Sequence, residues 1–228
     1  MLFRSDGFHS AVREVVEALV EKSPVHEEFA PASGDSPESR EKRPPEKSFI
    51  NLFPGMISPK DIRHLKDITE AFKIGCVMLP DYSERLDGAL WSEYTNIQPG
   101  GTDIEDIRRM GKAEASIELG RILAGRKSAG RYLEDHFRVP CKSIGFPIGV
   151  NETDVLLDAL SKISGRPIPG RFTAQRGRLI DSFVDGHKYV SGIKAVVYGE
   201  EDLVVGLVSF LREIGIIPVL CASGAESG

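Results

Sequence analysis

Short apolar runs and amphipathic stretches alternate along the chain, and this alternation predicts strands followed by helices. Residues 48–54 (SFINLFP) and 76–79 (CVML) are continuous apolar runs typical of buried strands. Between them, Ser58 and Pro59 supply an N-cap and a proline for the first helical turn. An apolar stripe at helical spacing follows at Ile62, Leu65, Ile68, Thr69 and Phe72. The order strand, helix, strand predicts an α/β fold with a parallel sheet.

The same pattern continues beyond a long connection. Residues 113–119 predict a third strand, and residues 132–137 mark a helix with apolar positions at Tyr132, Leu133 and Phe137. The sequence of residues 151–154 (NETD) predicts the capped start of another helix, which Gly165 is expected to end.

Residues 80–101 form the long connection, and loops of this length in compact domains usually carry function or face a partner. Trp91 and Tyr94 are candidate anchors within it. Thr102 with Glu105 forms a capping-box sequence that predicts a short helix immediately afterwards.

Residues 171–190 (RFTAQRGRLIDSFVDGHKYV) predict an amphipathic helix at the joint between two strand and helix series. Its apolar side consists of Leu179, Ile180, Phe183, Val184, His187 and Val190, and its polar side of Arg178, Asp181, Asp185 and Lys188. Arg176 and His187 project toward the apolar side, where each needs a hydrogen-bonding or anionic partner. Burial rules favour two satisfied core or interface residues, and a catalytic or ligand role for His187 is the alternative.

A second series follows this helix. Residues 193–198 predict a strand, residues 200–214 a helix, and residues 217–221 another strand, with Leu203, Leu207, Phe210 and Leu211 facing inward. The last strand leaves an apolar edge that a complete domain would pair or cover. At the other end, an amphipathic helix over residues 8–19 has almost nothing ahead of it to pack against. We therefore expect the chain to be an internal piece of a longer protein.

These patterns divide the chain into five parts. Residues 1–21 form a helix from the end of a first domain, and residues 22–47, rich in proline and charge, form a disordered linker or insert. Residues 48–170 form a middle Rossmann-like α/β domain, residues 171–192 a connecting helix, and residues 193–228 the start of a third Rossmann-like domain.

Composition narrows the class of function. The chain has 228 residues, 41% of them hydrophobic, which is enough to fill a core, and its formal net charge is −5. A net negative charge argues against nucleic acid and anionic membranes as partners, and leaves small molecules and proteins. There is neither a signal-peptide pattern nor an apolar run of about 18 residues, so a cytoplasmic location is expected.

No catalytic or metal constellation stands out among the reactive side chains. Cys76, Cys141 and Cys221 are too few and too scattered for a disulfide framework or a CxxC metal site. Cys76 and Cys221 lie in apolar strands and are expected to be buried, inert thiols, whereas the state of Cys141 beside Lys142 is open. The five histidines lack metal-ligand spacing.

Two acidic stretches also favour structural roles. Residues 198–202 (YGEED) stand where a Rossmann phosphate loop would stand, but they contain one glycine, and their three acids suit the helix dipole and would repel phosphate. We therefore expect a capped structural helix there. Asp81, Glu84 and Asp87 are candidates for paired catalytic carboxylates, although solvated side chains are the favoured interpretation.

Six segments of the chain, in order, are INLFPGMISPKDIRHLK, MLPDYSERLDG, PGGTDIEDIRRMG, FPIGVNETDVLLDALSKISGRPIP, RGRLIDSFVDGHKY and AVVYGEEDLVVGLVSFLREIG. Together they resemble component 1 of nitrogenase, and most closely the β-type subunits of molybdenum-iron proteins. The resemblance runs nearly continuously over residues 48–221 and weakly over residues 7–20. The VDGH portion is also similar to the scaffold paralogue on which the nitrogenase cofactor is assembled.

The resemblance implies a three-domain α/β subunit that pairs with an α-type subunit in an α2β2 assembly. In that family an iron-sulfur cluster between the subunits passes electrons from an ATP-dependent iron protein to a metal cofactor in the partner, where dinitrogen is reduced. The cluster-ligating cysteines of the family precede the region that this chain matches. We therefore assign no catalytic, cofactor-binding or metal-binding residue here, and expect the chain alone to be inactive.

The resemblance implies scaffold and subunit-contact roles for nine residues. They are Gly100, Gly101 and Thr102 before the short helix, Asp154 at a helix start, and Arg176, Arg178, Asp181, Asp185 and His187 on the joint helix. The leading hypothesis is a β-type subunit of a nitrogenase or nitrogenase-like reductase. The alternatives are a scaffold for assembly of the iron-molybdenum cofactor, and a stand-alone small-molecule binding module built from two Rossmann-like units.

Overall fold

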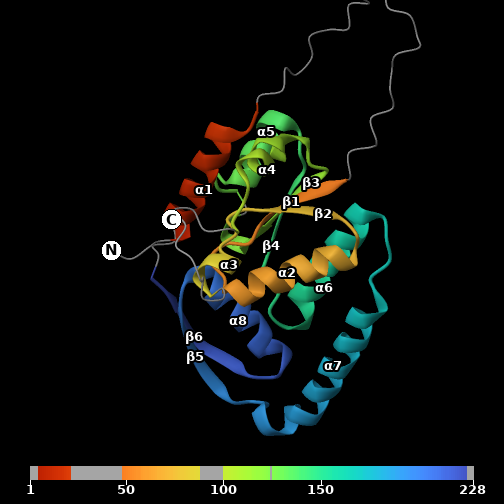
Figure 1. Cartoon of the computed structure of the whole chain (residues 1–228). Coiled ribbons are helices and arrows are strands. Elements are labelled where there is room, and N and C mark those ends of the chain that lie inside the picture. The colour runs from red at the N-terminus through yellow and green to blue at the C-terminus, as the bar shows by residue number, and fades with distance from the viewer. Residues whose placement is uncertain (1–4, 22–47, 88–99, 124, 225–228) are drawn as a thin grey trace, which may run out of the picture.

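The structure is a computed structural model that describes residues 5–21, 48–87, 100–123 and 125–224. Its helices are α1 (Ser5–Leu19), α2 (Pro59–Ala71), α3 (Ser83–Leu86), α4 (Ile104–Arg108), α5 (Ala129–Phe137), α6 (Gly149–Ser164), α7 (Gly170–Val190) and α8 (Glu201–Glu213), with 3-10 turns η1 (Arg109–Lys112) and η2 (Arg121–Leu123). Its strands are β1 (Phe49–Phe53), β2 (Gly75–Met78), β3 (Ala115–Leu119), β4 (Cys141–Ile144), β5 (Lys194–Gly199) and β6 (Ile217–Ser223). The predicted α/β class is confirmed (Figure 1).

Four strands form one parallel sheet in the order β2-β1-β3-β4. The chain leaves β1 toward β2 on one side and later enters β3 on the other, so the direction of winding reverses between β1 and β3. The predicted strands around residues 48–54, 76–79 and 113–119 are confirmed. β4 was not predicted, because its sequence CKSI is polar and three of its four residues are only partly buried or exposed.

Helices cover both faces of this sheet, which explains why β1 and β3 are buried along their whole length. On one face, α2 and α6 pack against Ile50, Leu52 and Ile117. On the other, α1, η1 and α5 pack against Phe49 and Phe53. Figure 1 shows the two groups of helices on opposite sides of the strands. The predicted stripe of α2 is confirmed, since Ile62, Leu65, Ile68, Thr69 and Phe72 are all buried.

Some helix ends are capped by residues adjacent in sequence, and others by residues that are distant in sequence. Ser58 caps α2 by accepting a hydrogen bond from Asp61 N, and Gly165 ends α6 with φ +64°, as predicted. The predicted cap at Asn151 is wrong, because α6 begins at Gly149. The carboxylate of Glu213, at the end of α8, accepts from Val150 N at 2.7 Å and from Asn151 N at 3.0 Å. A distant acid therefore caps α6.

The joint helix is present as α7, but its predicted apolar side is only partly buried within the chain: Phe183 is half-buried against Phe210 of α8, with ring centroids 5.9 Å apart. Leu179, Ile180 and Val184 are 39%, 37% and 70% exposed. Only the first turn reaches the core, where Phe172 stacks on Phe72 with ring centroids 6.3 Å apart. Beyond that turn, α7 runs along the side of the molecule toward β5 and β6 (Figure 1).

The predicted second series is confirmed as β5, α8 and β6, which form a parallel two-stranded sheet with its helix. The inward side of α8 was predicted wrongly in part: Leu203 is 42% exposed, whereas Asp202, Val204 and Gly206 are buried. The reason is that α8 packs against α6 and η2 as well as its own strands. β6 is exposed along most of its length, in agreement with the predicted open edge.

Three predictions lie outside the described residues: the linker over residues 22–47 and the anchors Trp91 and Tyr94. None of the helices in the described ranges combines the length and apolar character needed to cross a membrane.

Candidate functional site

A pocket lies where the strand ends of the four-stranded sheet meet α8 of the second series. Met56 follows β1, Leu119 ends β3 and Phe146 follows β4, and all three side chains line it. In open parallel sheets, ligands bind outside the carboxyl ends of the strands where the winding reverses. The reversal between β1 and β3 is at this pocket, so its position is that of a ligand site.

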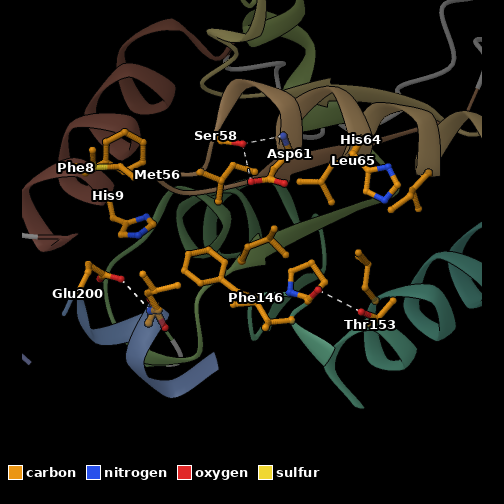
Figure 2. Close-up of a pocket in the computed structure, with 18 residues that line it drawn as sticks. Phe8, His9, Met56, Ser58, Asp61, His64, Leu65, Phe146, Thr153 and Glu200 are labelled. Atoms are coloured by element: carbon orange, nitrogen blue, oxygen red, sulfur yellow. Dashed lines mark hydrogen bonds between the residues drawn. The ribbon is translucent and has the colours of Figure 1, made fainter. Parts of the chain in front are cut away.

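The pocket has a volume of about 610 Å³ and a mainly apolar lining. Leu65 and Ile68 come from α2, Leu156 from α6 and Leu203 from α8. Figure 2 shows Met56, Leu65 and Phe146 among the labelled side chains around the central space, with Phe8 and His9 of α1 at one side. Two structural units therefore line the pocket: the four-stranded sheet with its helices, and the unit of β5, α8 and β6.

The polar groups of the pocket include three carboxylates, and each is held at the start of a helix. Ser58 Oγ donates to Asp61 Oδ2 at 2.7 Å, and Glu200 Oε2 accepts from Leu203 N at 3.0 Å (Figure 2). Asp202 is 3% exposed, and its Oδ1 accepts from Ile122 N at 3.2 Å. The predicted capped helix at residues 198–202 is confirmed, with Glu200 as its N-cap.

Asp202 gives the chain a testable pH dependence. Burial raises the pKa of Asp202 to about 6, and the charges of Glu200 and Glu201 act in the same direction. Because the folded pKa is above the unfolded value, the folded state binds the proton more tightly. The resulting stabilisation is present below about pH 4 and is lost as the pH rises through about 6.

We therefore expect the free energy of unfolding of the wild type, relative to Asp202→Asn, to fall by about 1–2 kcal/mol between pH 4 and pH 7, after allowance for solvent screening. Urea unfolding of both proteins across this range measures the difference. If the difference in unfolding free energy between the two proteins did not change with pH, proton uptake by Asp202 would be contradicted. Asp103→Asn is a control, since Asp103 is an exposed N-cap on the other side of the sheet.

The structure brings two of the predicted site residues together. Arg176 Nε donates to both carboxylate oxygens of Asp154 at 2.9 Å, joining α7 to α6. Arg176 thus has an anionic partner, as predicted from the sequence, but both side chains are exposed and not buried. Arg178, Asp181 and Asp185 are exposed on α7.

His187 lies at the far end of α7, against the second series. Its side chain is exposed, and a Cβ added at Gly215 would come within 3.0 Å of its Nε2. Gly215 has φ +86° in the turn between α8 and β6, so His187 rests on that turn. This contact is structural, and among the described residues His187 belongs to no group of three or more His, Cys, Asp or Glu side chains that could hold a metal.

Gly100, Gly101 and Thr102 form the approach to α4. Both glycines have positive φ, +95° and +103°, which side-chain-bearing residues rarely adopt. The predicted capping box at Thr102 is wrong, because Asp103 caps α4 by accepting from Glu105 N. Thr102 Oγ1 instead donates to Met78 O at 2.5 Å and accepts from Asp81 N at 3.2 Å. It thereby ties this segment to the end of β2.

The acidic residues of the 80–101 connection are ion-paired rather than merely solvated. Lys66 Nζ lies 2.5 Å from Asp81 Oδ2, and Asp81 is largely buried. Arg63 donates to both carboxylate oxygens of Asp87 at 2.7 and 2.9 Å. Both cations come from α2, so the two pairs fix the start of the connection on that helix.

The cysteines do not form a metal or cluster site. Burial raises the pKa of the Cys76 thiol to about 12, and burial with the neighbouring Glu118 raises that of Cys141. Cys76 is on β2 and Cys141 on β4, three strand spacings or about 14 Å apart. Cys221 is on β6 and is exposed, which corrects the prediction that it is buried. These residues do not fit an iron-sulfur cluster.

Sequence reasoning missed most of the pocket. Met56 and Phe146 are ordinary apolar residues in the sequence, and only their places after parallel strands point to a site. Glu118 and Glu213 were also missed. Glu118 is 1% exposed in β3, and an acid in an otherwise apolar strand is the signal that marks it as a buried, partnered group.

Comparison with known proteins identifies the family. A model of nitrogenase component 1 type oxidoreductases matches residues 4–228. The nitrogenase molybdenum-iron protein beta chain of Clostridium pasteurianum is 36% identical over 77% of this chain and 38% of its own length. The nitrogenase iron-molybdenum cofactor biosynthesis protein NifN of Bradyrhizobium diazoefficiens is 32% identical over 97% of this chain and 44% of its own length.

The solved structure of nitrogenase Cp1 at pH 6.5 superposes with a TM-score of 0.82 at 31% identity, over 98% of this chain and 44% of that chain. This chain thus spans less than half the length of the relatives it matches. The resemblance stated from the sequence is confirmed by all three comparisons. The chain belongs to the family of nitrogenase component 1 type oxidoreductases.

Proposed function

We propose that this chain is part of a β-type subunit of a nitrogenase or nitrogenase-like reductase. In that role it assists electron transfer to a metal cofactor held with an α-type partner, for reduction of dinitrogen. The observation that carries the proposal is the close match of nearly the whole chain to a nitrogenase component 1 structure. An α2β2 assembly and an ATP-dependent iron protein as electron donor complete the proposal.

The chain's own residues serve this role as scaffold and contact surface. Since Cys76, Cys141 and Cys221 do not fit a cluster, the proposal takes no cluster ligand from them. The exposed part of α7 is the proposed contact with the α-type partner, with Leu179, Ile180 and Val184 as apolar contacts. His187 is on the same side of α7 as these apolar residues, and Arg178, Asp181 and Asp185 are exposed on its polar side; all four are the proposed polar contacts. Protein interfaces usually combine apolar and polar residues.

The segment of Gly100, Gly101 and Thr102 and the Asp154–Arg176 pair have supporting roles in the proposal. The pair holds α7 in its direction relative to α6, and therefore orients the contact surface. Thr102 fixes the end of the 80–101 connection to β2.

A scaffold for assembly of the iron-molybdenum cofactor is the second candidate. It is supported by a cofactor-biosynthesis relative that is 32% identical over 97% of the chain. The two candidates share a fold and differ in whether the assembled complex turns over substrate.

Co-expression with an α-type subunit tests the proposal. We expect the partner to co-purify with the chain, and Val184→Asp to reduce the recovered partner at least about tenfold, because a charge would enter the apolar contact. His187→Ala is expected to reduce it less. Ile104→Asp is the matched control, an exposed apolar residue on α4 that is 54% exposed. No co-purification, or equal losses for Val184→Asp and Ile104→Asp, would contradict the contact.

An assay of substrate reduction distinguishes the two candidate functions. With the iron protein, ATP and a reductant, reduction of acetylene or dinitrogen by the purified complex supports the reductase. A complex that delivers cofactor to a cofactor-free nitrogenase without reducing either substrate supports the scaffold and overturns the leading proposal.

A further inference from the structure

The pocket between α2, α6 and α8 has the size and position of a ligand site that the proposed subunit role does not use. Its volume of about 610 Å³ is within the range of about 300–1,000 Å³ that small-molecule sites have. It lies at the carboxyl ends of β1, β3 and β4, where the winding of the sheet reverses. Two observations on its lining decide which ligands suit it.

The first observation is that the helix starts around the pocket already hold carboxylates. α2 begins with Ser58 bonded to Asp61, and α8 begins with Glu200 bonded to Leu203 N. α6 begins with Glu213 bonded to the N–H groups of Val150 and Asn151. In nucleotide-binding α/β folds, these helix N-termini bind phosphate. Here acids of the chain bond the N–H groups at the starts of α6 and α8, and at α2 the Ser58 hydroxyl accepts from Asp61 N beside the Asp61 carboxylate.

The second observation is the charge of the wall. Asp61, Glu200 and Asp202 line the pocket together with His9 and His64, and among the described residues that line it there is neither lysine nor arginine. An anionic ligand would meet repulsion at short range in a partly desolvated space, whereas a cation would be attracted. The rest of the wall is mainly aliphatic and aromatic, with Leu65, Ile68, Leu119, Phe146, Ile148 and Leu156.

We propose that this pocket binds a small, mainly apolar molecule that carries one cationic amine. The apolar body lies between Leu65 of α2 and Leu156 of α6, and the amine faces the acids at the starts of α2 and α8. Nucleotides and other phosphate-bearing ligands are excluded by the same acids. The site is independent of the proposed subunit contact, because α7 contributes no residue to the pocket wall.

Three probes of one shape and different charge test the proposal on the full chain: 4-phenylbutylamine, 4-phenylbutanol and 4-phenylbutyrate. Isothermal titration at pH 7.5 measures their affinities. We expect the amine to bind at least about tenfold more tightly than the carboxylate, with the alcohol between them. The proposal would be overturned by equal affinities for the three probes or by tighter binding of the carboxylate. It would also be overturned if the amine showed no saturable binding up to about 10 mM, since any affinity beyond that concentration is very weak.

Variants locate the binding at this pocket. Leu203→Trp places a larger side chain at the rim and is expected to weaken amine binding at least about fivefold. Its matched control is Val205→Trp on the same helix, since Val205 is 37% exposed and is not among the described lining residues. An unchanged amine affinity in Leu203→Trp, or an equal loss in Val205→Trp, would overturn the location.

A second variant tests the charge and does not depend on how Leu203→Trp folds. Asp61→Asn is expected to weaken amine binding about two- to fivefold and to leave alcohol binding unchanged, because an exposed carboxylate contributes a modest attraction. Asp67→Asn, also exposed on α2 and outside the described lining, is the control. An equal effect of the two substitutions on amine binding would contradict the role of Asp61.

Discussion

Glu118→Ala is expected to lower the free energy of unfolding by about 3–5 kcal/mol, the largest effect that we expect from a single substitution in this chain. Glu118 is 1% exposed in the middle of the four-stranded sheet. Its carboxylate accepts from Ser128 Oγ at 2.8 Å and from Gly130 N at 2.7 Å. Removing it leaves buried donors at the start of α5 without an acceptor, and also leaves a cavity.

Urea unfolding followed by circular dichroism measures this loss, and a fall of roughly 10 °C in the melting temperature is expected to accompany it. Glu118→Gln retains one acceptor oxygen and is expected to lose less. Glu114→Ala is the matched control, because Glu114 is exposed one residue before β3 and should change stability by less than about 0.5 kcal/mol. Equal losses for Glu118→Ala and Glu114→Ala would show that the buried carboxylate is not the anchor of α5.

The regular elements were predictable because their side chains repeat at the period of the element. β1 is buried on both faces and reads as a continuous apolar run, and α2 carries both its stripe and its capping residue in sequence. β4 has no such pattern, since it is at the edge of the sheet and only Ile144 is fully buried. An apolar pattern reflects burial, and β4 is buried too little to show one, whereas β2 at the other edge of the sheet keeps an apolar sequence.

The candidate site was less predictable because it depends on contacts between distant segments. Asp154 and Arg176 were each singled out, but their ion pair joins residues 22 positions apart on different helices. Lys66 and Asp81 were not recognised as a pair for the same reason. The pocket gathers residues from α1, α2, α6, α8 and three strand ends, and none of these segments has an unusual sequence of its own.

α7 shows a different limit of sequence reasoning. Its amphipathic pattern correctly predicted a helix but not what covers the apolar side, because Leu179, Ile180 and Val184 remain exposed in this chain. An apolar stripe on a helix indicates a face that is suited to burial. It does not indicate whether the same chain or a partner protein covers that face. The proposed contact with an α-type subunit uses this face.

Glu213 is the second residue at which we expect a large effect, because it joins the two structural units from a distance. Its carboxylate, on α8, caps α6 through Val150 N and Asn151 N. The helix α7 separates these partners in sequence, so the two hydrogen bonds also hold β5, α8 and β6 against the four-stranded sheet. Glu213→Ala is expected to lower the free energy of unfolding by about 2–3 kcal/mol, since it removes two charge-assisted bonds and the cap of α6.

Hydrogen exchange followed by mass spectrometry distinguishes this loss from a general weakening. In Glu213→Ala, protection is expected to fall over residues 194–223 and in the first turn of α6, while β1 and β3 keep theirs, because the substitution loosens one unit from the other. Arg212→Ala, an exposed neighbour on the same helix, should leave the exchange pattern unchanged. A uniform loss of protection across both sheets would contradict the cap as the link, since it would mean that the second unit unfolds only together with the first.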